Sequence, residues 1–461
     1  MLWLSAILFF LLRLPSLFEP YWYSDEGVYL ALGQGIRHGL TLYSQIYDNK
    51  PPAIYYLAAL TQTVFGFRLL LMLWMIPTCF YFYKLAKNYL PLKRAKVALL
   101  LFVILTSIPV IEGHIANAEI FMLLPTILGF LLFEKYIFWS GLALGFTFLF
   151  KVPVAIEFFF LFCFAFFILK KYKNLKPLIV FGISFLLPTI IVVIYFQLNT
   201  ALLPFLSSAF FQNLGYLSSW STGNQQSNPT TSGLPLRLVL MLLSWLFFYY
   251  QYYKKNIDKK ILFLSCWFMA CLFGILLSTR PYPHYLIQIV PPLILVILYH
   301  KNYFLNKILL ILILAYSIFH YKFYFYATAS YYQNFIQYVL KQKNVEAYRQ
   351  YFGQNVNYFY QISSYIDTKS APDDTIFVWS DDPYIYPLSN RLPSTKYITA
   401  YHVLDYNGYE IILNQLKIKL PQIIVYNQSM SRPFPALDEF INNYYFLDNQ
   451  IGPYYLFYKL R

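Results

Sequence analysis

Long apolar runs joined by short polar loops recur over residues 1–326, and this pattern limits the folds open to the chain more than any other feature. About 20 apolar residues in a helix cross the hydrocarbon core of a bilayer. The 461-residue chain is 59% hydrophobic and 12% charged, whereas about a quarter of the residues in soluble proteins are charged. We therefore predict a polytopic α-helical membrane protein. Its eleven predicted spans are residues 2–18, 67–83, 97–111, 118–134, 137–150, 153–169, 177–195, 236–252, 261–278, 285–299 and 308–326.

Four loops between these runs are basic and set the predicted orientation. Residues 84–96, 170–176, 254–260 and 301–307 together hold fifteen lysines and arginines and one acid. Short basic loops stay in the cytoplasm, and the predicted spans place all four on one side. The N-terminus is then cytoplasmic, and the net charge of +15 needs no nucleic-acid partner. The predicted outer segments are residues 19–66, 112–117, 196–235 and 279–284, Lys151 and everything after residue 327.

Two apolar stretches need separate interpretation. Residues 53–66 are apolar enough to cross, but a crossing there would move the basic loop 84–96 to the outer side. We therefore predict a helix lying against the outer face, or the start of a long tilted span. The N-terminal run has no small-residue cleavage site before Asp25, so it is predicted to be a retained span and not a signal peptide. The four cysteines lie inside apolar runs and are predicted to be small buried residues.

The composition changes after residue 327. We predict helices at 331–366, 405–419 and 435–443, and strands at 375–380, 396–400, 422–427 and 454–459. The predicted domains are therefore a membrane domain, residues 1–326, and a small extracytoplasmic α/β domain, residues 327–461, which is accessory because it has no glycine-rich phosphate loop. Within the loop 196–235, the stretch STGNQQSNPTTSG is either a flexible linker or a flap over a substrate entrance.

Ionisable residues gather in the predicted outer loops, at the membrane edge, where charged groups are costly and are usually paired or functional. The first loop is the most polar, because an acid pair opens its central stretch and a lysine before two prolines closes it. The candidate residues are Asp25, Glu26, Asp48 and Lys50 in the first loop, Glu112, His114 and Glu119 in the second, Lys151 alone, and Arg280 and His284 in a late loop.

The chemistry that these residue types favour is the displacement of a sugar from a polyprenyl phosphate. The phosphate leaves as an anion, so cations can replace a general acid. The attacking hydroxyl needs a base, which a carboxylate supplies. We predict that Asp25 is this base and that Lys50 holds the lipid phosphate. A two-carboxylate glycosidase is disfavoured, because nothing in the sequence is typical of a soluble sugar-binding cleft.

Structural roles remain open for the same residues. Asp25 and Glu26 also fit the first turn of a short helix, where acids interact well with the helix dipole. Lys50 before two prolines also fits a helix start. Lys151 can simply extend to the interface, and His114 and His284 can be hydrogen-bonding residues there and not metal ligands.

Four motifs in order resemble the GT-C glycosyltransferases, in particular the bacterial group of protein O-mannosyltransferases and lipid A aminoarabinose transferases. Residues 25–55, which begin DEGVY and include NKPP, resemble the first loop of that group, and HIANAEIFMLLP resembles its second acidic motif. GLALGFTFLFKVPVAI resembles its glycine-rich span, and RPYPHYLIQIVPPL its late segment. The tail, with IFVWSDDPYIYPLSNRLP, resembles the soluble domain of bacterial members.

The resemblance implies a sugar transferase of the cytoplasmic membrane that works on the outer face, uses a polyprenyl-phosphate donor and inverts the sugar. It implies that Asp25 is the base, with Glu26 beside it, that Lys50 lies at the donor phosphate and that Glu119 is the second acid. Arg280 and Lys151 are further phosphate partners. Tyr29, Asp48, His114 and His284 are expected substrate contacts.

The sequence departs from the resemblance at Asn49, where aminoarabinose transferases carry an acid that can bind a metal. No cofactor is therefore assigned, and dependence on a divalent metal stays open. The expected partners are the lipid-linked donor, the bilayer and a glycan, lipid or protein acceptor. A transporter or flippase is the alternative function, and a scaffold whose tail recruits partners is a third. The transporter is disfavoured because the ionisable residues lie at span ends and the two halves show no repeat.

Overall fold

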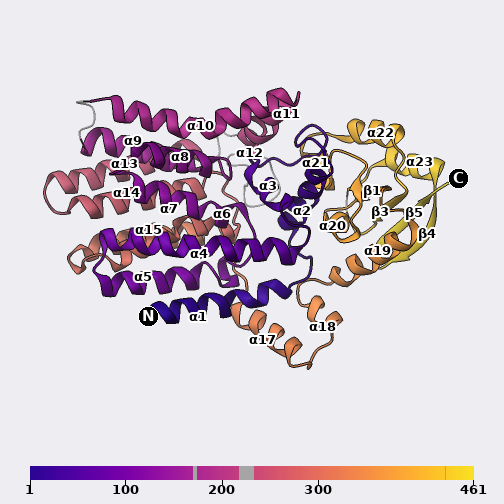
Figure 1. Cartoon of the computed structure of the whole chain (residues 1–461), viewed down its shortest axis with the longest axis horizontal. Coiled ribbons are helices and arrows are strands. Elements are labelled where there is room, and N and C mark those ends of the chain that lie inside the picture. Colours follow the sequence, from indigo (N-terminus) through magenta and orange to yellow (C-terminus); the bar gives the residue numbers. More distant parts are fainter. Residues whose placement is uncertain (170–173, 217–232, 431, 461) are drawn as a thin grey trace. The chain divides into compact units, whose positions relative to one another are not determined.

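The structure is a computed structural model that describes residues 1–169, 174–216, 233–430 and 432–460, and most of these residues are helical (Figure 1). Contacts within the chain divide it into two compact units, and each is described by itself. The helical unit comprises Met1–Leu14, Leu71–Tyr195 and Phe210–Thr328. The mixed unit comprises Pro15–Leu70, Phe196–Ala209 and Ala329–Arg461. The first loop and the C-terminal part of the chain therefore belong to the same unit.

Each of the eleven apolar runs forms a helix in the described residues. Three helices, α4, α10 and α13, are long and apolar enough to cross a membrane by length and composition, and six shorter apolar helical stretches accompany them. The total number of spans stays a prediction. The helices of the runs are α1 (Leu2–Arg13), α4 (Val64–Tyr89), α5 (Leu92–Leu105), α6 (Ala118–Phe121), α7 (Leu123–Leu132), α8 (Ile137–Phe148), α9 (Val154–Cys163), α10 (Lys176–Leu198), α13 (Leu234–Tyr253), α14 (Lys259–Ile275), α15 (Val290–Leu298) and α16 (Phe304–His320).

Short helices connect the long ones, and of these α11, most of η1 and the first half of η5 belong to the mixed unit. They are η1 (Leu14–Phe18), η2 (Pro109–Ile111), η3 (Phe164–Ile168), α11 (Leu202–Leu206), η5 (Ser207–Phe211), α12 (Gln212–Tyr216), η6 (Pro283–Ile289) and η7 (Lys301–Tyr303). Most of the stretch STGNQQSNPTTSG, interpreted as a linker or a flap, lies outside the described residues, and so does part of the basic loop 170–176.

Helix α14 lies at the centre of the helical unit, since every residue from Ile261 to Ile275 is buried. A helix that is apolar on all sides needs neighbours on all sides. Glycines bring other helices close: a Cβ at Gly141 would lie 2.1 Å from Ser184 Oγ, and one at Gly145 would lie 2.1 Å from the carbonyl oxygen of Phe185. These two glycines are four residues apart on α8, the spacing that lets α8 and α10 pack backbone to backbone in membranes.

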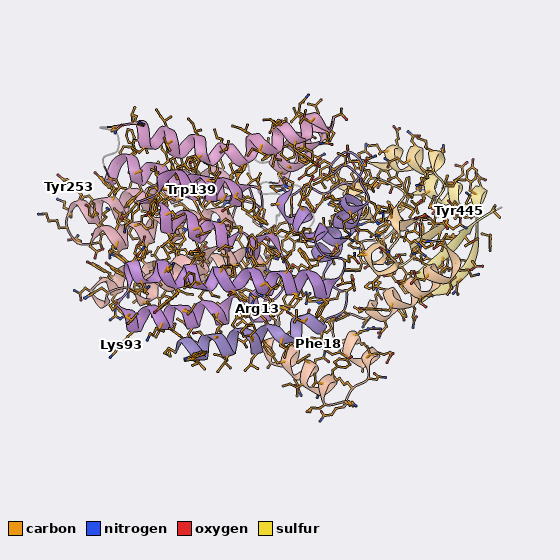
Figure 2. All side chains as sticks on the ribbon, viewed as in Figure 1. Arg13, Phe18, Lys93, Trp139, Tyr253 and Tyr445 are labelled. Atoms are coloured by element: carbon orange, nitrogen blue, oxygen red, sulfur yellow. The ribbon has the colours of Figure 1, made fainter. Side chains whose placement is uncertain are left out.

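The outer surface of the helical unit carries large apolar side chains. Trp139 on α8 is 57% exposed and Tyr253 at the end of α13 is 71% exposed (Figure 2). Many further apolar side chains on α10, α13 and α16 are exposed as well. Such an extensive apolar surface is costly in water, and it fits helices that face lipid.

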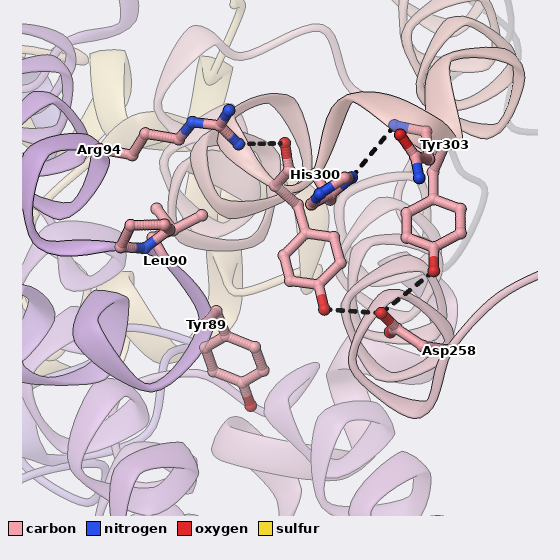
Figure 3. Close-up of a pocket in the computed structure, with 9 residues that line it drawn as sticks. Tyr89, Leu90, Arg94, Asp258, His300 and Tyr303 are labelled. Carbon is pink, nitrogen blue, oxygen red and sulfur yellow. Dashed lines mark hydrogen bonds between the residues drawn. The ribbon is translucent and has the colours of Figure 1, made fainter.

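Three of the four basic loops meet at one end of the helical unit, around a cavity of about 350 Å³ lined by Tyr89, Arg94, Asp258, His300 and Tyr303, among others (Figure 3). Asp258 begins α14 by accepting from the backbone of Ile261, and it also accepts from Tyr303 at 3.2 Å. Since α14 runs away from Asp258, the segment around Arg280 lies at the opposite end. The grouping of these loops agrees with the predicted topology, although membrane sidedness stays a prediction.

The mixed unit contains a five-stranded sheet of order β2-β1-β3-β5-β4. Strands β1 (Thr375–Trp379), β2 (Leu392–Pro393) and β3 (Ile423–Asn427) are parallel, and β5 (Tyr454–Lys459) and β4 (Tyr445–Ile451) form an antiparallel hairpin beside β3. Its helices are α2 (Ser24–Arg37), α3 (Ala53–Ala59), α17 (Thr328–Val339), α18 (Val345–Gln350), α19 (Val356–Lys369), α20 (Ile385–Ser389), α21 (Ala400–Asp405), α22 (Tyr409–Ile418) and α23 (Pro435–Tyr444).

One strand prediction for this unit was wrong, and the strands β2 and β4 were not predicted. Residues 396–400 are not a strand: the Lys396 amide donates to the Gln415 side chain and the Ala400 amide to the Ser380 carbonyl. These donors hold a loop that leads into α21. Strand β4 was missed because its side chains are mostly exposed and do not alternate. Residues 53–66 contain the seven-residue helix α3, about 10 Å long, which is too short to cross a membrane.

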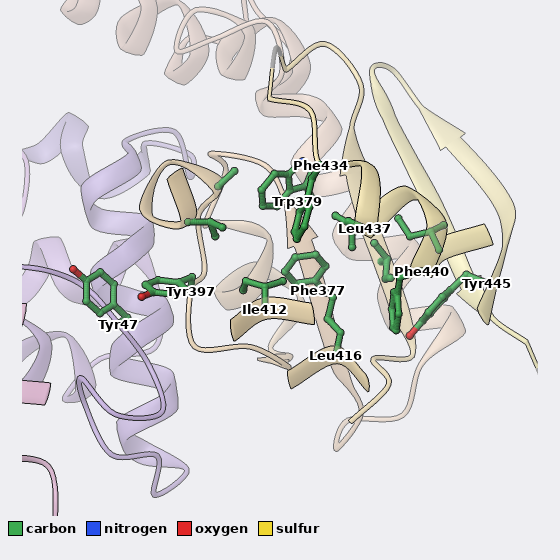
Figure 4. Packing of buried hydrophobic residues seen from close by; sticks show 14 residues of the cluster. Tyr47, Phe377, Trp379, Tyr397, Ile412, Leu416, Phe434, Leu437, Phe440 and Tyr445 are labelled. Atoms are coloured by element: carbon green, nitrogen blue, oxygen red, sulfur yellow. The ribbon is translucent and has the colours of Figure 1, made fainter. Parts of the chain in front are cut away.

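The core of the mixed unit includes a side chain from the first loop. Tyr47 packs with Tyr397 at a ring distance of 4.9 Å, and the same buried cluster continues to Phe377, Trp379 and Phe434 (Figure 4). Because Tyr47 is only 1% exposed, the first loop is an integral part of this unit. The predicted domain boundary lies between residues 326 and 327. The mixed unit, however, also contains Pro15–Leu70, which precede this boundary in the chain.

Candidate functional site

Asp25 and Lys50 form an ion pair at the start of α2. Asp25 lies in the first turn of the helix, where the dipole favours an acid. Its Oδ2 is 3.2 Å from Lys50 Nζ and accepts from the hydroxyl of Tyr29, one turn further on, at 3.2 Å. The side chains of Lys50 and Asp25 are 26% and 28% exposed. The pair is therefore ordered and also reachable.

The surroundings of Lys50 keep it cationic. Burial alone would lower the pKa of Lys50, but Asp25, Tyr29 and Asp48 outweigh burial and raise it well above its usual value. The ammonium group also lies 5.0 Å from the centre of the Tyr29 ring, a cation–π contact. A permanent cation that is accessible on one side is suited to an anionic ligand.

The backbone of Lys50 is held by two tyrosines. Its N–H donates to the Tyr55 hydroxyl at 3.1 Å, and its carbonyl accepts from the Tyr43 hydroxyl at 2.7 Å. Tyr55 donates in turn to Asp48 at 2.7 Å. The two prolines after Lys50 have no N–H and fixed φ angles, so they stiffen the exit of the loop. The backbone of Lys50 is thus held in place, and its side chain extends from this fixed point.

Asp48 faces inward and contacts the C-terminal part of the chain. Its Oδ1 lies 3.3 Å from Nε2 of His402 on α21, and the carboxylate is 3% exposed. Burial alone would raise the pKa of Asp48, but Lys50, His402 and Tyr55 together hold it well below its usual range. In this structure Asp48 supports the loop, so the predicted substrate contact stays a prediction.

Glu26 lies in a buried ionic cluster. Arg68 donates to both of its carboxylate oxygens, at 2.8 and 2.6 Å, and also pairs with Glu19 at 2.5 Å. Glu19 accepts from Tyr331 at 2.5 Å. Since Glu26 is 1% exposed, its carboxylate contacts Arg68 and not the surface. Its place among the catalytic residues stays a prediction.

The helical unit holds a second charged cluster. Lys151 Nζ pairs with Glu119 Oε1 and lies 3.7 Å from the centre of the Tyr285 ring. His284 bonds to Glu112 through Nδ1, and its Nε2 is 3.6 Å from Glu119. Three motifs distant in the sequence therefore meet within this unit. Glu119 is buried, whereas the Lys151 side chain is 20% exposed.

The remaining predicted residues of this unit lie nearby in the chain. His114 is 2% exposed and follows Glu112, which ends η2 in a left-handed conformation with φ of 60°. Arg280 is half-buried and precedes η6, whose residues include His284. The first-loop residues and these residues belong to different units, so their convergence on one face stays a prediction.

The residues beside Lys50 do not fit the metal site that the resemblance raised. Asn49 offers an amide, which donates to the Tyr406 hydroxyl at 3.4 Å. Both oxygens of Asp48 already have partners, His402 and Tyr55. In the part of the chain that the structure describes, no three His, Cys, Asp or Glu side chains are grouped to hold a metal ion.

Sequence reasoning missed several residues of these clusters. Tyr55 is the last residue of the first motif, but nothing in the sequence pointed to its contacts to Asp48 and Lys50. Arg68 lies in an apolar run, where a lone charge signals a buried partner. His402 carried no local signal, because its partner Asp48 is far away in the chain. Only the fold shows this last pair.

Comparisons with known proteins reveal a shared fold. The sequence matches no protein-family model and no curated protein. Two crystal structures of ArnT from Cupriavidus metallidurans, one bound to undecaprenyl phosphate and one in the apo state, each match with a TM-score of 0.58 and 12% identity. The match covers 99% of this chain and 96% of the ArnT chain. ArnT is an aminoarabinose transferase of the GT-C class. The predicted GT-C-like fold is therefore confirmed, whereas the number of spans stays a prediction.

Proposed function

Because the chain has the fold of ArnT over almost its whole length, we propose that it is a multi-pass membrane glycosyltransferase with a polyprenyl-phosphate sugar donor. The observation that carries this proposal is the accessible pair of Asp25 and Lys50 at the start of α2. One member is a base and the other is an anchor for phosphate. One of the ArnT structures was solved with undecaprenyl phosphate, which supports a donor of this class.

The proposed reaction is a single displacement. Asp25 accepts the proton of the acceptor hydroxyl, and that oxygen forms a bond to the anomeric carbon of the sugar. The bond between this carbon and the phosphate oxygen breaks, and the polyprenyl phosphate leaves with the electron pair. Lys50 stabilises the charge that develops on the leaving oxygen. Attack opposite to the leaving group inverts the sugar.

The ion pair between Asp25 and Lys50 favours binding of the donor before the acceptor. While Lys50 is bonded to Asp25 at 3.2 Å, the carboxylate is partly neutralised and is a weaker base. A donor phosphate that attracts Lys50 releases the carboxylate for proton transfer. The raised pKa of Lys50 ensures that the amine does not itself compete as a base. Donor binding then activates Asp25.

The second cluster is proposed to serve the same reaction through its cations. We assign Lys151 and Arg280 to the donor phosphate and Glu119 to the positioning of the acceptor. Lys151 is partly exposed and held by Glu119 and Tyr285, so its charge is oriented before a ligand arrives. His114, His284 and Tyr29 are proposed substrate contacts. Asp48 is buried and held by His402 and Tyr55, so its proposed effect on the substrate passes through Lys50.

The proposed location is the cytoplasmic membrane, with the N-terminus in the cytoplasm and residues 327–461 on the outer side as the accessory domain. The three basic loops that meet at one end of the helical unit support this orientation. The proposed acceptor is a hydroxyl or phosphate group of a protein, a lipid or a cell-surface glycan on the outer face.

A transfer assay tests the proposal. Purified protein in detergent is incubated with radiolabelled polyprenyl-phosphate hexoses and pentoses and with an envelope extract as acceptor. We expect the wild type to release label from one donor and Asp25→Asn to release none. If no donor releases label, although the protein unfolds cooperatively on heating and is therefore folded, the proposed donor class is overturned. Equal release by Asp25→Asn would overturn the assignment of the base.

A further inference from the structure

The C-terminal part of the chain contacts the support of Lys50 through one buried histidine. His402 on α21 is 2% exposed, and its Nε2 lies 3.3 Å from Asp48 Oδ1. Its Nδ1 is 3.0 Å from the hydroxyl of Thr399, which is 2% exposed. The Asp48 carboxylate faces Nε2, so this nitrogen carries a hydrogen, and in the tautomer protonated at Nε2 alone Nδ1 accepts from Thr399.

The contacts continue from Asp48 to Lys50. The other oxygen of Asp48 accepts from the Tyr55 hydroxyl at 2.7 Å, and the oxygen of that hydroxyl accepts from the Lys50 amide at 3.1 Å. A hydroxyl that donates to one group and accepts from another has a defined direction. Thr399, His402, Asp48, Tyr55 and Lys50 thus form one continuous chain of polar contacts, in which an ion-pair contact joins His402 to Asp48 and hydrogen bonds form the other links.

Burial makes this chain stiff. Asp48 and Tyr55 are 3% and 0% exposed, so water cannot replace a lost partner. Leaving a buried carboxylate with one donor fewer costs more than losing an exposed hydrogen bond. The rings around the histidine add to this, since Tyr47 lies edge-on to His402 at 5.1 Å. The position of Asp48 therefore depends on His402.

We propose that His402 is a positioning residue for Lys50 and thereby tunes the binding of the donor phosphate. This proposal rests on the proposed function for its second half. His402 does not contact the ammonium group: it orients Asp48, Asp48 orients Tyr55, and Tyr55 holds the Lys50 backbone. The C-terminal part of the chain thus takes part in forming the phosphate site.

Hydrogen exchange tests the first half without any activity. The variant His402→Phe keeps a ring but removes the donor, and His402→Gln keeps a side-chain N–H. The control Tyr445→Phe removes a buried hydrogen bond to Pro421, 2.8 Å long, from the same unit. In His402→Phe we expect the Lys50 amide, followed in a peptide over residues 47–55, to exchange about tenfold faster. His402→Gln should restore most of the protection, and Tyr445→Phe should leave it unchanged.

Kinetics test the second half. We expect His402→Phe to raise the KM for the lipid-linked donor about tenfold and to change kcat by less than about threefold. His402→Gln should recover the lower KM. A purely structural role would lower the amount of folded enzyme and would leave the KM of the folded fraction unchanged. If His402→Phe does not fold, Thr399→Val, which keeps the histidine, should give a smaller shift in the same direction.

The outcomes separate the two proposals. Unchanged exchange of the Lys50 amide in both His402→Phe and Thr399→Val would overturn the positioning role whatever the enzyme does. Faster exchange with an unchanged KM would overturn the role in donor binding. Faster exchange in a protein whose wild type transfers no sugar would overturn the proposed function and would still support the positioning of Lys50.

Discussion

Lys50 Nζ lies 3.2 Å from Asp25 Oδ2, so the proposed phosphate anchor and the proposed base neutralise each other before any ligand binds. The two residues come from different helix starts, α2 and the Lys-Pro-Pro segment before α3. Both side chains are about one quarter exposed. Electrostatic attraction holds the two side chains together, and an anion that binds Lys50 would compete with Asp25 for it. The first two predictions follow from this competition.

Replacing Asp25 should remove the base without unfolding the protein. Asp25→Asn keeps the size and the contact to Tyr29, and it should lower kcat by about a hundredfold or more, in the range of general base catalysis. Donor binding should be retained or improved, because Lys50 loses a competing partner. The measurement is transfer rate together with binding of undecaprenyl phosphate. Weaker lipid binding by Asp25→Asn would contradict the competition between the two anions.

Replacing Lys50 should weaken donor binding. Lys50→Met removes the charge, and we expect the affinity for undecaprenyl phosphate to fall about ten- to a hundredfold. Lys50→Arg keeps the charge but not the compact ammonium group, so it should recover part of the affinity. The control Lys93→Met alters a lysine in the first turn of α5, within the basic segment 84–96, and should bind as the wild type does. Equal affinities of Lys50→Met and wild type would refute the phosphate anchor.

The buried ion cluster of Arg68 should be essential for stability. Arg68→Met leaves Glu19 and Glu26 buried without their cation, and breaking a buried pair in this way costs about 3–5 kcal/mol. The matched control is Lys369→Met, which removes a surface pair with Asp448 and should cost less than about 1 kcal/mol. Thermal unfolding in detergent compares them, and similar Tm values for the two variants would contradict the assigned role.

Stability should fall in acid through Asp48. Burial opposes its ionisation, but Lys50, His402 and Tyr55 outweigh burial and lower its pKa in the folded state. A carboxyl whose pKa is lowered by folding stabilises the protein above its unfolded value, about 4, and this contribution is lost as the pH falls below that value. Asp48→Asn should therefore be less stable at pH 7 and should lose less stability between pH 5 and pH 3. Parallel unfolding curves for wild type and variant would contradict this.

A close approach of α2 and α3 should make Gly33 intolerant of a side chain. A Cβ there would lie 2.7 Å from the backbone carbon of Ala58 and the nitrogen of Ala59. Because backbone cannot move aside cheaply, Gly33→Ala should cost about 1–3 kcal/mol and should displace the end of α3, where Ala58 and Ala59 lie. The control Gly182→Ala has no atom within 4 Å of its added carbon and should be neutral or stabilising. Tm values of both variants check this.

The sequence by itself determined the elements and the residue types. Each of the eleven apolar runs contains a helix, because lipid leaves the backbone of an apolar run no other partner than itself. The motifs around Asp25, Glu119, Lys151 and His284 were visible as charges at the ends of such runs. Local pattern also predicted β1 and β3, whose side chains are largely buried, and the partly buried β5. It predicted neither the two-residue β2 nor the exposed β4.

Only the tertiary structure decided which of these residues meet. Asp25 pairs with Lys50, Glu119 with Lys151, and Asp48 with His402, and each pair joins separate elements. An ion pair acts over a few ångströms in space, whereas a sequence pattern reports neighbours within a turn or a strand. Glu26 was predicted from its place beside Asp25, yet the next position on a helix points elsewhere, and the fold buries it against Arg68. The His402 contact left no local trace, because long-range packing alone creates it.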